Sequence, residues 1–278
     1  MKTLSTALSH GGTQGVYSHH SMACACEMTF AVFVPPMSGT KPLPVLWYLS
    51  GLTCTHQNVM DKGEYRRLAA ELGLIIVCPD TSPRGQTVPD EPDNWQFGCG
   101  AGFYLDATQA PFSANYRMYT YLTEELPALI AAEFPADMER QGIFGHSMGG
   151  HGALTLALKN AGRFRSCSAF APIVHPSTAH WSTGAFTKYL GENQTAWRAY
   201  DAVSLIEDGK RFPEFLVDQG SADSFLDDGL QPWLLETACK DAGIPLTLNM
   251  REGYDHSYNF ISTFMDDHLR WHAQRLAV

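Results

Sequence analysis

The hydrophobic and polar positions along this chain follow two alternating patterns. Short runs of largely apolar residues are typical of buried strands. Such runs cover residues 28–34, 43–49, 74–78, 141–144, 166–170, 214–217 and 245–250. Between them, stretches with helical periodicity or strong helix formers predict helices. These helices are expected at 65–72, around 119–130, in the second half of 145–160, and at 258–276.

The alternation of strands with helices predicts an α/β fold. Its sheet should be mostly parallel and flanked by helices, with ligands bound at the carboxyl ends of the strands. The Pro- and Gly-rich segment 81–110 is expected to be a long loop. The sequence contains no internal repeat or linker, and 278 residues is a length that undivided α/β domains reach. We therefore expect a single domain spanning 1–278.

Composition narrows the class of protein. The formal net charge of −10 argues against nucleic acid as a partner, because proteins that bind it usually carry basic patches. The sequence contains neither an apolar run of transmembrane length nor the apolar core of a secretory signal, so no membrane partner is expected. Seven cysteines, an odd number in a chain too large to need disulfides, predict reduced thiols and a cytoplasmic location.

Residues 145–149, Gly-His-Ser-Met-Gly, match the G-x-S-x-G pattern of a nucleophile elbow. A short apolar strand precedes the motif and a helix follows it, which is the context that the elbow requires in the α/β-hydrolase fold. The alternative interpretation is a structural Gly-rich turn. The context favours Ser147 as a nucleophile in an α/β-hydrolase fold.

A serine hydroxyl needs a base to remove its proton, and this fold supplies the acid and then the histidine after the serine in chain order. His256 lies in a loop between the last expected strand and the last expected helix, where the fold places its base. Structural or surface roles are expected for the other candidates: His146, His151, His175, His180, His268 and His272. His146 and His151 should hydrogen-bond locally. His268 and His272 could share a metal ion, but without a third ligand nearby they are expected on a solvated helix face.

The acid should follow the strand at 214–217, where four aspartates are candidates. Asp218 ends the strand, and Asp227 and Asp228 are expected on the next helix. Asp223 falls in the exposed turn between them. We therefore expect Asp223 to orient the imidazole of His256.

An oxyanion hole requires two backbone N–H groups directed at the tetrahedral intermediate. One should come from Met148, which follows the nucleophile, and the other from Leu52, in the loop after the strand at 43–49. The alternative for the Leu52 segment is an ordinary glycine turn. Cys54, two positions later, is expected either to line the site or to act as a small buried hydrophobe, and both interpretations stay open.

Several longer segments resemble the S-formylglutathione hydrolase, or esterase D, family. They are 50–55 (SGLTCT), 79–85 (PDTSPRG), 97–104 (FGCGAGFY), 116–119 (YRMY), 145–154 (GHSMGGHGAL) and 253–258 (GYDHSY). The resemblance implies hydrolysis of S-formylglutathione to glutathione and formate in formaldehyde detoxification, without metal or organic cofactor, by a chain that forms a homodimer. It also carries over Ser147, Asp223 and His256 as a triad, with Leu52 and Met148 as the oxyanion donors.

Other functions are compatible with the same residues. A general short-chain carboxylesterase would use the same triad, and so would an acyltransferase of related fold. A noncatalytic binding protein of this fold is disfavoured, because the serine, the acid, the histidine and both amide positions are all present.

Overall fold

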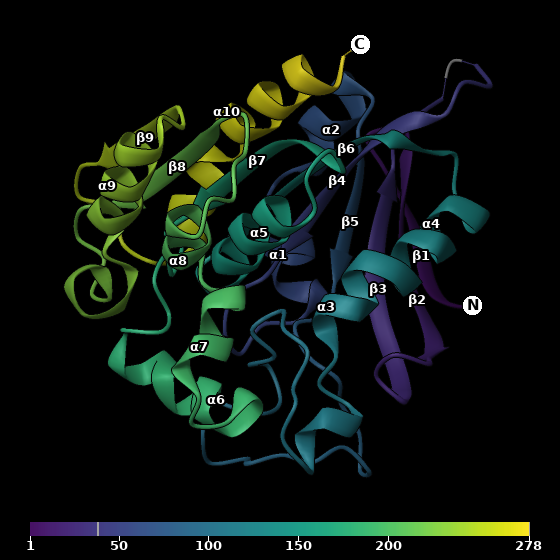
Figure 1. Ribbon diagram of the computed structural model, residues 1–278. Coiled ribbons are helices and arrows are strands. Elements are labelled where there is room, and N and C mark those ends of the chain that lie inside the picture. The colour runs from purple at the N-terminus through teal and green to yellow at the C-terminus, as the bar shows by residue number, and fades with distance from the viewer. Residues whose placement is uncertain (38, 278) are drawn as a thin grey trace.

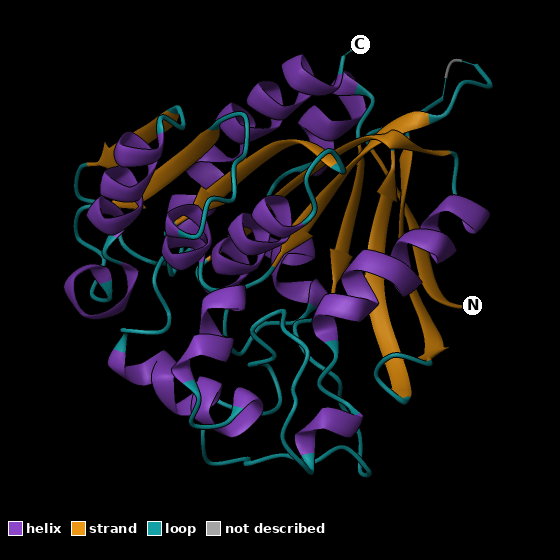
Figure 2. Ribbon diagram, in the orientation of Figure 1, coloured by secondary structure: helices purple, strands orange, loops and turns teal. Residues whose placement is uncertain are grey.

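The computed structural model describes residues 1–37 and 39–277, and the nine strands found there form one sheet in the order β1-β2-β3-β5-β4-β6-β7-β8-β9 (Figure 2). The strands are β1 (Lys2–Ser9), β2 (Gly12–Ser21), β3 (Cys26–Val34), β4 (Leu43–Leu49), β5 (Ile75–Pro79), β6 (Ala136–His146), β7 (Phe164–Phe170), β8 (Phe215–Gly220) and β9 (Leu246–Arg251). Six neighbouring strands are parallel, namely β5, β4, β6, β7, β8 and β9. In contrast, β1, β2 and β3 pair antiparallel with their neighbours. The expected α/β-hydrolase architecture is confirmed.

All seven expected strands are present, but β1 and β2 were not predicted. β1 is a solvent-exposed strand at the edge of the sheet, and its sequence KTLSTALS is rich in polar residues. Because such a strand buries little surface, its sequence lacks the apolar run that identifies the central strands.

Helices cover both faces of the sheet (Figure 1). They are α1 (His56–Lys62), α2 (Arg66–Leu72), α3 (Met118–Thr120), α4 (Leu126–Glu133), α5 (Met148–Lys159), α6 (His180–Leu190), α7 (Gln194–Trp197), α8 (Ala202–Glu207), α9 (Pro232–Ala242) and α10 (Tyr258–Leu276). A π-helical stretch joins α3 to α4, so the helix expected around 119–130 is continuous. The helix α10 packs with α1 and α2 on one face, while α4, α5, α8 and α9 cover the other.

The long connections gather at one end of the sheet. Segment 81–110 contains no helix or strand, as expected, and lies beside α6 and α7 below the sheet in Figure 1. The carboxyl ends of the parallel strands open toward this end, because the loops after β4, β6, β8 and β9 line one common cavity. The fold therefore brings segments that are distant in sequence to a single site.

Candidate active site

Ser147 occupies the tight turn between β6 and α5. Its backbone has φ of 59° and ψ of −119°, in a region that a non-glycine residue enters at a cost of about 1–3 kcal/mol. Gly149 permits this turn, since a Cβ there would lie 1.9 Å from the carbonyl oxygen of Leu49 at the end of β4. Ser147 is also the N-cap of α5 but makes no side-chain capping hydrogen bond. The turn thus presents the hydroxyl without committing it to the helix.

His256 and Asp223 lie beside the nucleophile turn, in the loops after β9 and β8. Nδ1 of His256 is 2.6 Å from Oδ2 of Asp223. Gln219 Nε2 donates to the same oxygen at 3.1 Å, and the Phe225 N–H donates to Oδ1 at 2.9 Å. The buried carboxylate therefore fixes the imidazole with Nδ1 protonated, which leaves Nε2 as the basic nitrogen. We refer to Ser147, Asp223 and His256 as the candidate triad.

Asp218, the competing acid, is bound by side chains of the neighbouring strand β9. It accepts hydrogen bonds from Asn249 Nδ2 at 2.8 Å and from Arg251 Nε at 2.7 Å. Its side chain is fully buried, and these donors occupy both of its oxygens. Asp227 and Asp228 lie on a π-helical turn and are exposed. Of the four candidates, only Asp223 is positioned to hold His256.

Two backbone amides close to the nucleophile turn lack a hydrogen-bond acceptor within the described residues. Among the described residues, the N–H groups of Leu52 and Met148 donate to no other backbone or side-chain acceptor. The loop that carries Leu52 approaches closely, since a Cβ on Gly51 would lie 3.1 Å from Cβ of Ser147. Unpaired amides beside a nucleophile, one of them at a helix N-terminus, can stabilise a developing negative charge.

Ser147 and His256 of the candidate triad border a cavity of about 290 Å³. Its walls are mostly apolar, and the lining residues are Gly51, Leu52, Thr53, Cys54, Asn58, Trp95, His146, Ser147, Phe225, His256 and Tyr258. Cys54 is partly exposed in this wall, and burial raises the pKa of its thiol, so it is protonated near neutral pH. The structure thus favours the interpretation of Cys54 as a lining residue. A cavity of this size and polarity suits a small acyl group.

His146 does not hydrogen-bond locally, contrary to the sequence-based expectation. Neither ring nitrogen has a partner among the described residues, although the ring is buried. The ring lies 4.4 Å from that of His256, centroid to centroid, and burial lowers the pKa of His146 well below its usual value. His146 is thus a neutral ring packed against the proposed base. The same expectation was wrong for His151, because its Nε2 lies 2.9 Å from the carbonyl oxygen of Phe103, a residue far away in sequence.

The expectation of a solvated face for His268 and His272 was wrong. Both are fully buried between α10 and β7, because positions four apart fall on the face that also carries Leu269. Ser168 Oγ lies 2.8 Å from Nδ1 of His268 and 2.7 Å from Nε2 of His272, and Ser166 Oγ lies 2.6 Å from Nδ1 of His272. Burial lowers the pKa of His272 well below its usual value. Serine hydroxyls on β7 therefore serve as hydrogen-bond partners for the two buried imidazoles.

Sequence reasoning missed several residues of the site. Gln219 supports Asp223, and Trp95, Phe225 and Tyr258 supply aromatic surface to the cavity. A glutamine within an apolar strand is the one signal that could have identified Gln219, since buried amides usually serve a partner. Trp95 comes from the long loop, and its place at the cavity depends on tertiary structure alone.

The fold, the elbow and the residues around it define a serine hydrolase of the α/β-hydrolase class. Residues 21–271 match the model of an esterase family described as "Putative esterase". The chain is 50% identical over 279 residues to the S-formylglutathione hydrolase of Mus musculus, with 99% of each covered. It is 51% identical over 276 residues to that of Paracoccus denitrificans, covering 99% of this chain and 98% of the relative.

A solved structure of an S-formylglutathione hydrolase from Agrobacterium tumefaciens is 68% identical to this chain. It superposes with a TM-score of 0.98 over 99% of this chain and 100% of the other. The chain therefore belongs to the S-formylglutathione hydrolase family.

No helix within residues 1–37 and 39–277 is both long enough and apolar enough to cross a membrane. Across the same residues, no group of three His, Cys, Asp or Glu side chains is arranged to hold a metal ion.

Proposed function

We propose that the chain hydrolyses S-formylglutathione to glutathione and formate. The observation that carries the proposal is the candidate triad at a cavity of about 290 Å³, near the lower end of the usual size of ligand pockets. A formyl group fits within such a cavity, while the larger glutathione portion extends toward its open side.

The reaction is an acyl transfer in two halves. Ser147 Oγ attacks the thioester carbon as His256 Nε2 takes its proton, while Asp223 holds the imidazolium through Nδ1–H. The Leu52 and Met148 amides stabilise the oxyanion, and collapse of the tetrahedral adduct breaks the C–S bond. The thiolate of glutathione is a good leaving group, and it takes the proton held by His256, which returns the imidazole to its basic form.

The second half repeats these steps with water. His256 removes a proton from water, which attacks the formyl carbon. The serine oxygen then leaves and takes that proton back from His256. Formate is released and Ser147 is regenerated. His256 thus serves as base and then as acid in each half, and the chain's own residues supply every proton transfer.

The proposal is tested by comparing kcat/KM for S-formylglutathione and for p-nitrophenyl acetate. We expect kcat/KM for the thioester to be well above kcat/KM for the oxyester. Comparable or reversed values would favour the alternative, a general short-chain carboxylesterase. Labelling by a fluorophosphonate probe separates both from a noncatalytic binding protein, which would not react.

We propose that the chain works in the cytoplasm, as one domain that assembles into a homodimer. All seven cysteines are free thiols, which supports a reducing compartment. Light scattering after size-exclusion chromatography tests the dimer, and a single cooperative unfolding transition tests the single domain.

A further inference from the structure

The loop that carries the Leu52 amide is held at both ends by side chains. At its start, the buried Tyr104 hydroxyl donates to the carbonyl oxygen of Ser50 at 2.7 Å. At its end, the carbonyl oxygen of Cys54 accepts from Thr81 Oγ1 at 2.5 Å and from Arg84 Nη2 at 3.1 Å. These contacts fix the Ser50 and Cys54 carbonyls, two residues before and two residues after Leu52. The N–H of Leu52 itself stays unpaired.

Arg84 is itself held firmly. Its Nε donates to both oxygens of Asp80, at 3.1 and 2.9 Å, and its Nη1 lies 2.9 Å from Cys99 Sγ. Asp80 is buried at the end of β5 and also accepts from the Thr81 N–H at 2.6 Å. A planar guanidinium paired with a buried carboxylate keeps one orientation. Arg84 thereby connects the end of β5 to the loop that follows β4.

The loop needs such support because its backbone adopts a strained conformation at Thr53. Thr53 has a φ of 66°, a left-handed conformation that costs a β-branched residue more than most. Strained conformations of this kind persist only where surrounding contacts determine them. The Thr53 N–H donates to the carbonyl oxygen of Gly100 at 2.9 Å, and the Cys54 carbonyl is held as described. Releasing the Cys54 carbonyl would let Thr53 relax and turn the adjacent Leu52 amide.

We propose that Arg84, oriented by Asp80, is a positioning residue for the oxyanion hole. It holds the Cys54 carbonyl so that the Leu52 N–H points at the position of the oxyanion. Arg84 is not among the residues that line the cavity, so it acts through the loop and not by touching substrate. The proposal rests on the proposed acyl-transfer function. It adds to that function two residues outside the cavity, Arg84 and Asp80.

Arg84→Ala should lower kcat by about 10- to 100-fold with little change in KM, since losing one oxyanion donor outright costs about 10²- to 10³-fold. The loss should be similar for S-formylglutathione and p-nitrophenyl acetate, because both form the same kind of oxyanion. A trifluoromethyl ketone, which forms a tetrahedral oxyanion adduct with the serine, should bind more weakly by the same factor. Asp80→Asn should give a smaller loss of the same kind.

Arg275→Ala is the matched control. Arg275 makes a comparable two-pronged pair with Glu214, at 2.7 Å for each contact, and lies on α10 away from the cavity. This variant should keep kcat and the affinity for the ketone. Added guanidinium ion at millimolar concentration should partly restore kcat of Arg84→Ala and leave Arg275→Ala unchanged. Near-ultraviolet circular dichroism and Tm establish that each variant is folded.

A folded Arg84→Ala enzyme with wild-type kcat and ketone affinity would overturn the inference, and so would equal losses in both arginine variants. A wild-type enzyme that hydrolyses p-nitrophenyl acetate but not S-formylglutathione would instead overturn the proposed substrate, and Arg84 would still be tested on the oxyester. A wild type that hydrolyses neither would overturn both.

Discussion

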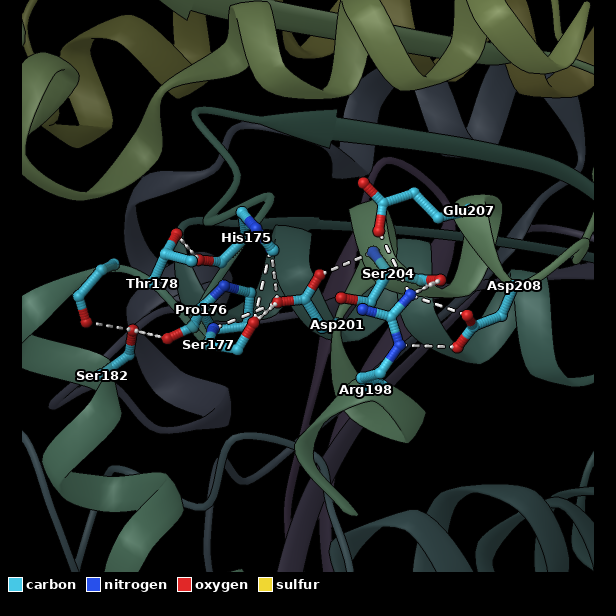
Figure 3. Close-up of polar contacts among 11 residues, drawn as sticks. His175, Pro176, Ser177, Thr178, Ser182, Arg198, Asp201, Ser204, Glu207 and Asp208 are labelled. Carbon is cyan, nitrogen blue, oxygen red and sulfur yellow. Dashed lines mark hydrogen bonds and ion pairs between the residues drawn. The ribbon is translucent and has the colours of Figure 1, made fainter. Parts of the chain in front are cut away.

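The candidate triad and the polar cluster before α8 contain the same three residue types in different arrangements. In the cluster, Nδ1 of His175 lies 2.8 Å from Oδ2 of Asp201, and the Ser177 hydroxyl donates to that same oxygen (Figure 3). The other Asp201 oxygen caps α8 by accepting from the Ser204 N–H at 2.9 Å. Serine and histidine therefore both bind the carboxylate, and the serine hydroxyl is committed to it.

The difference shows which features a hydrolase site needs beyond the three residue types. In the candidate triad, Ser147 lies in a turn with positive φ at the start of a long helix, beside the unpaired amides of Leu52 and Met148. The cluster instead uses its aspartate to cap a short helix and to hold the preceding loop. A histidine–aspartate pair is thus insufficient by itself, and the expected structural role of His175 agrees with its contacts.

The largest expected effect comes from the two serines. Ser147→Ala should abolish hydrolysis and fluorophosphonate labelling while the protein stays folded, because Ala fits the turn without added bulk. Ser177→Ala should retain kcat, since that hydroxyl only binds Asp201. Substantial hydrolysis by Ser147→Ala would contradict the assignment of Ser147 as the nucleophile. Loss of hydrolysis in Ser177→Ala would contradict the structural role of the second cluster.

The aspartates give the next largest effect. Asp223→Asn should lower kcat by about 10⁴-fold, as in other triads, because an amide cannot hold the imidazole in the required protonation state. Asp218→Asn should keep kcat near that of the wild type. Asp201→Asn should lower Tm, since a buried carboxylate with several donors is lost, and leave kcat largely intact. A greater kcat loss in Asp218→Asn would transfer the role of the acid to Asp218.

Chemical modification of Cys54 tests whether its side chain lines the cavity at the acyl position. A bulky thiol reagent should lower activity, because the modified side chain would fill the cavity or displace the Leu52 amide. Cys54→Ser should remain active and resist the reagent, since the thiol takes no part in bond making. Activity assays before and after treatment measure both effects. If the wild type is modified but stays fully active, Cys54 does not restrict the acyl position.

The smallest expected effect is on stability in the second cluster. Burial opposes protonation of His175, but the hydrogen bond and charge of Asp201 outweigh it and raise the pKa of His175. Burial also opposes ionisation of Asp201, but the hydrogen bonds and charge of His175 and the bond from Ser177 outweigh it and lower the pKa of Asp201. The pair therefore stabilises the fold between the unfolded pKa values of Asp, about 4, and His, about 6.5.

This contribution is lost as pH rises through the folded pKa of His175 and as pH falls through that of Asp201. The unfolding free energy of His175→Gln should differ from that of the wild type by on the order of 1 kcal/mol between about pH 4 and 6.5, and by less outside this window. Urea titrations at several pH values measure the difference. A gap that does not vary with pH would mean that the pair contributes only as a neutral hydrogen bond.

The core of the candidate site could be predicted from the sequence because each part follows a strand. The nucleophile motif follows a short apolar run, and His256 and Asp223 follow the last two strands, so chain order alone places them at one end of the sheet. The same reasoning placed Leu52 after β4. Resemblance over the whole chain then supplied the substrate class, which no single motif contains.

The remaining features depend on contacts that no local pattern records. The edge strand β1 is polar because it is exposed, and His268 is buried because Ser168 on β7 accommodates it. His146 was expected to bond locally because it lies within the elbow, but its ring turns toward His256. In these cases the partner is far away in sequence, so the environment of the side chain follows from tertiary packing.

The attachment of α10 has a consequence for the timing of activity during synthesis. His256 lies just before this helix, and the helix is held against β7 by the contacts of His268 and His272. A growing polypeptide therefore carries its serine long before the base can reach it. Esterase activity should appear only after α10 has left the ribosome and docked. Ribosome-bound chains arrested before α10 should show no turnover, whereas released full-length chains should be active.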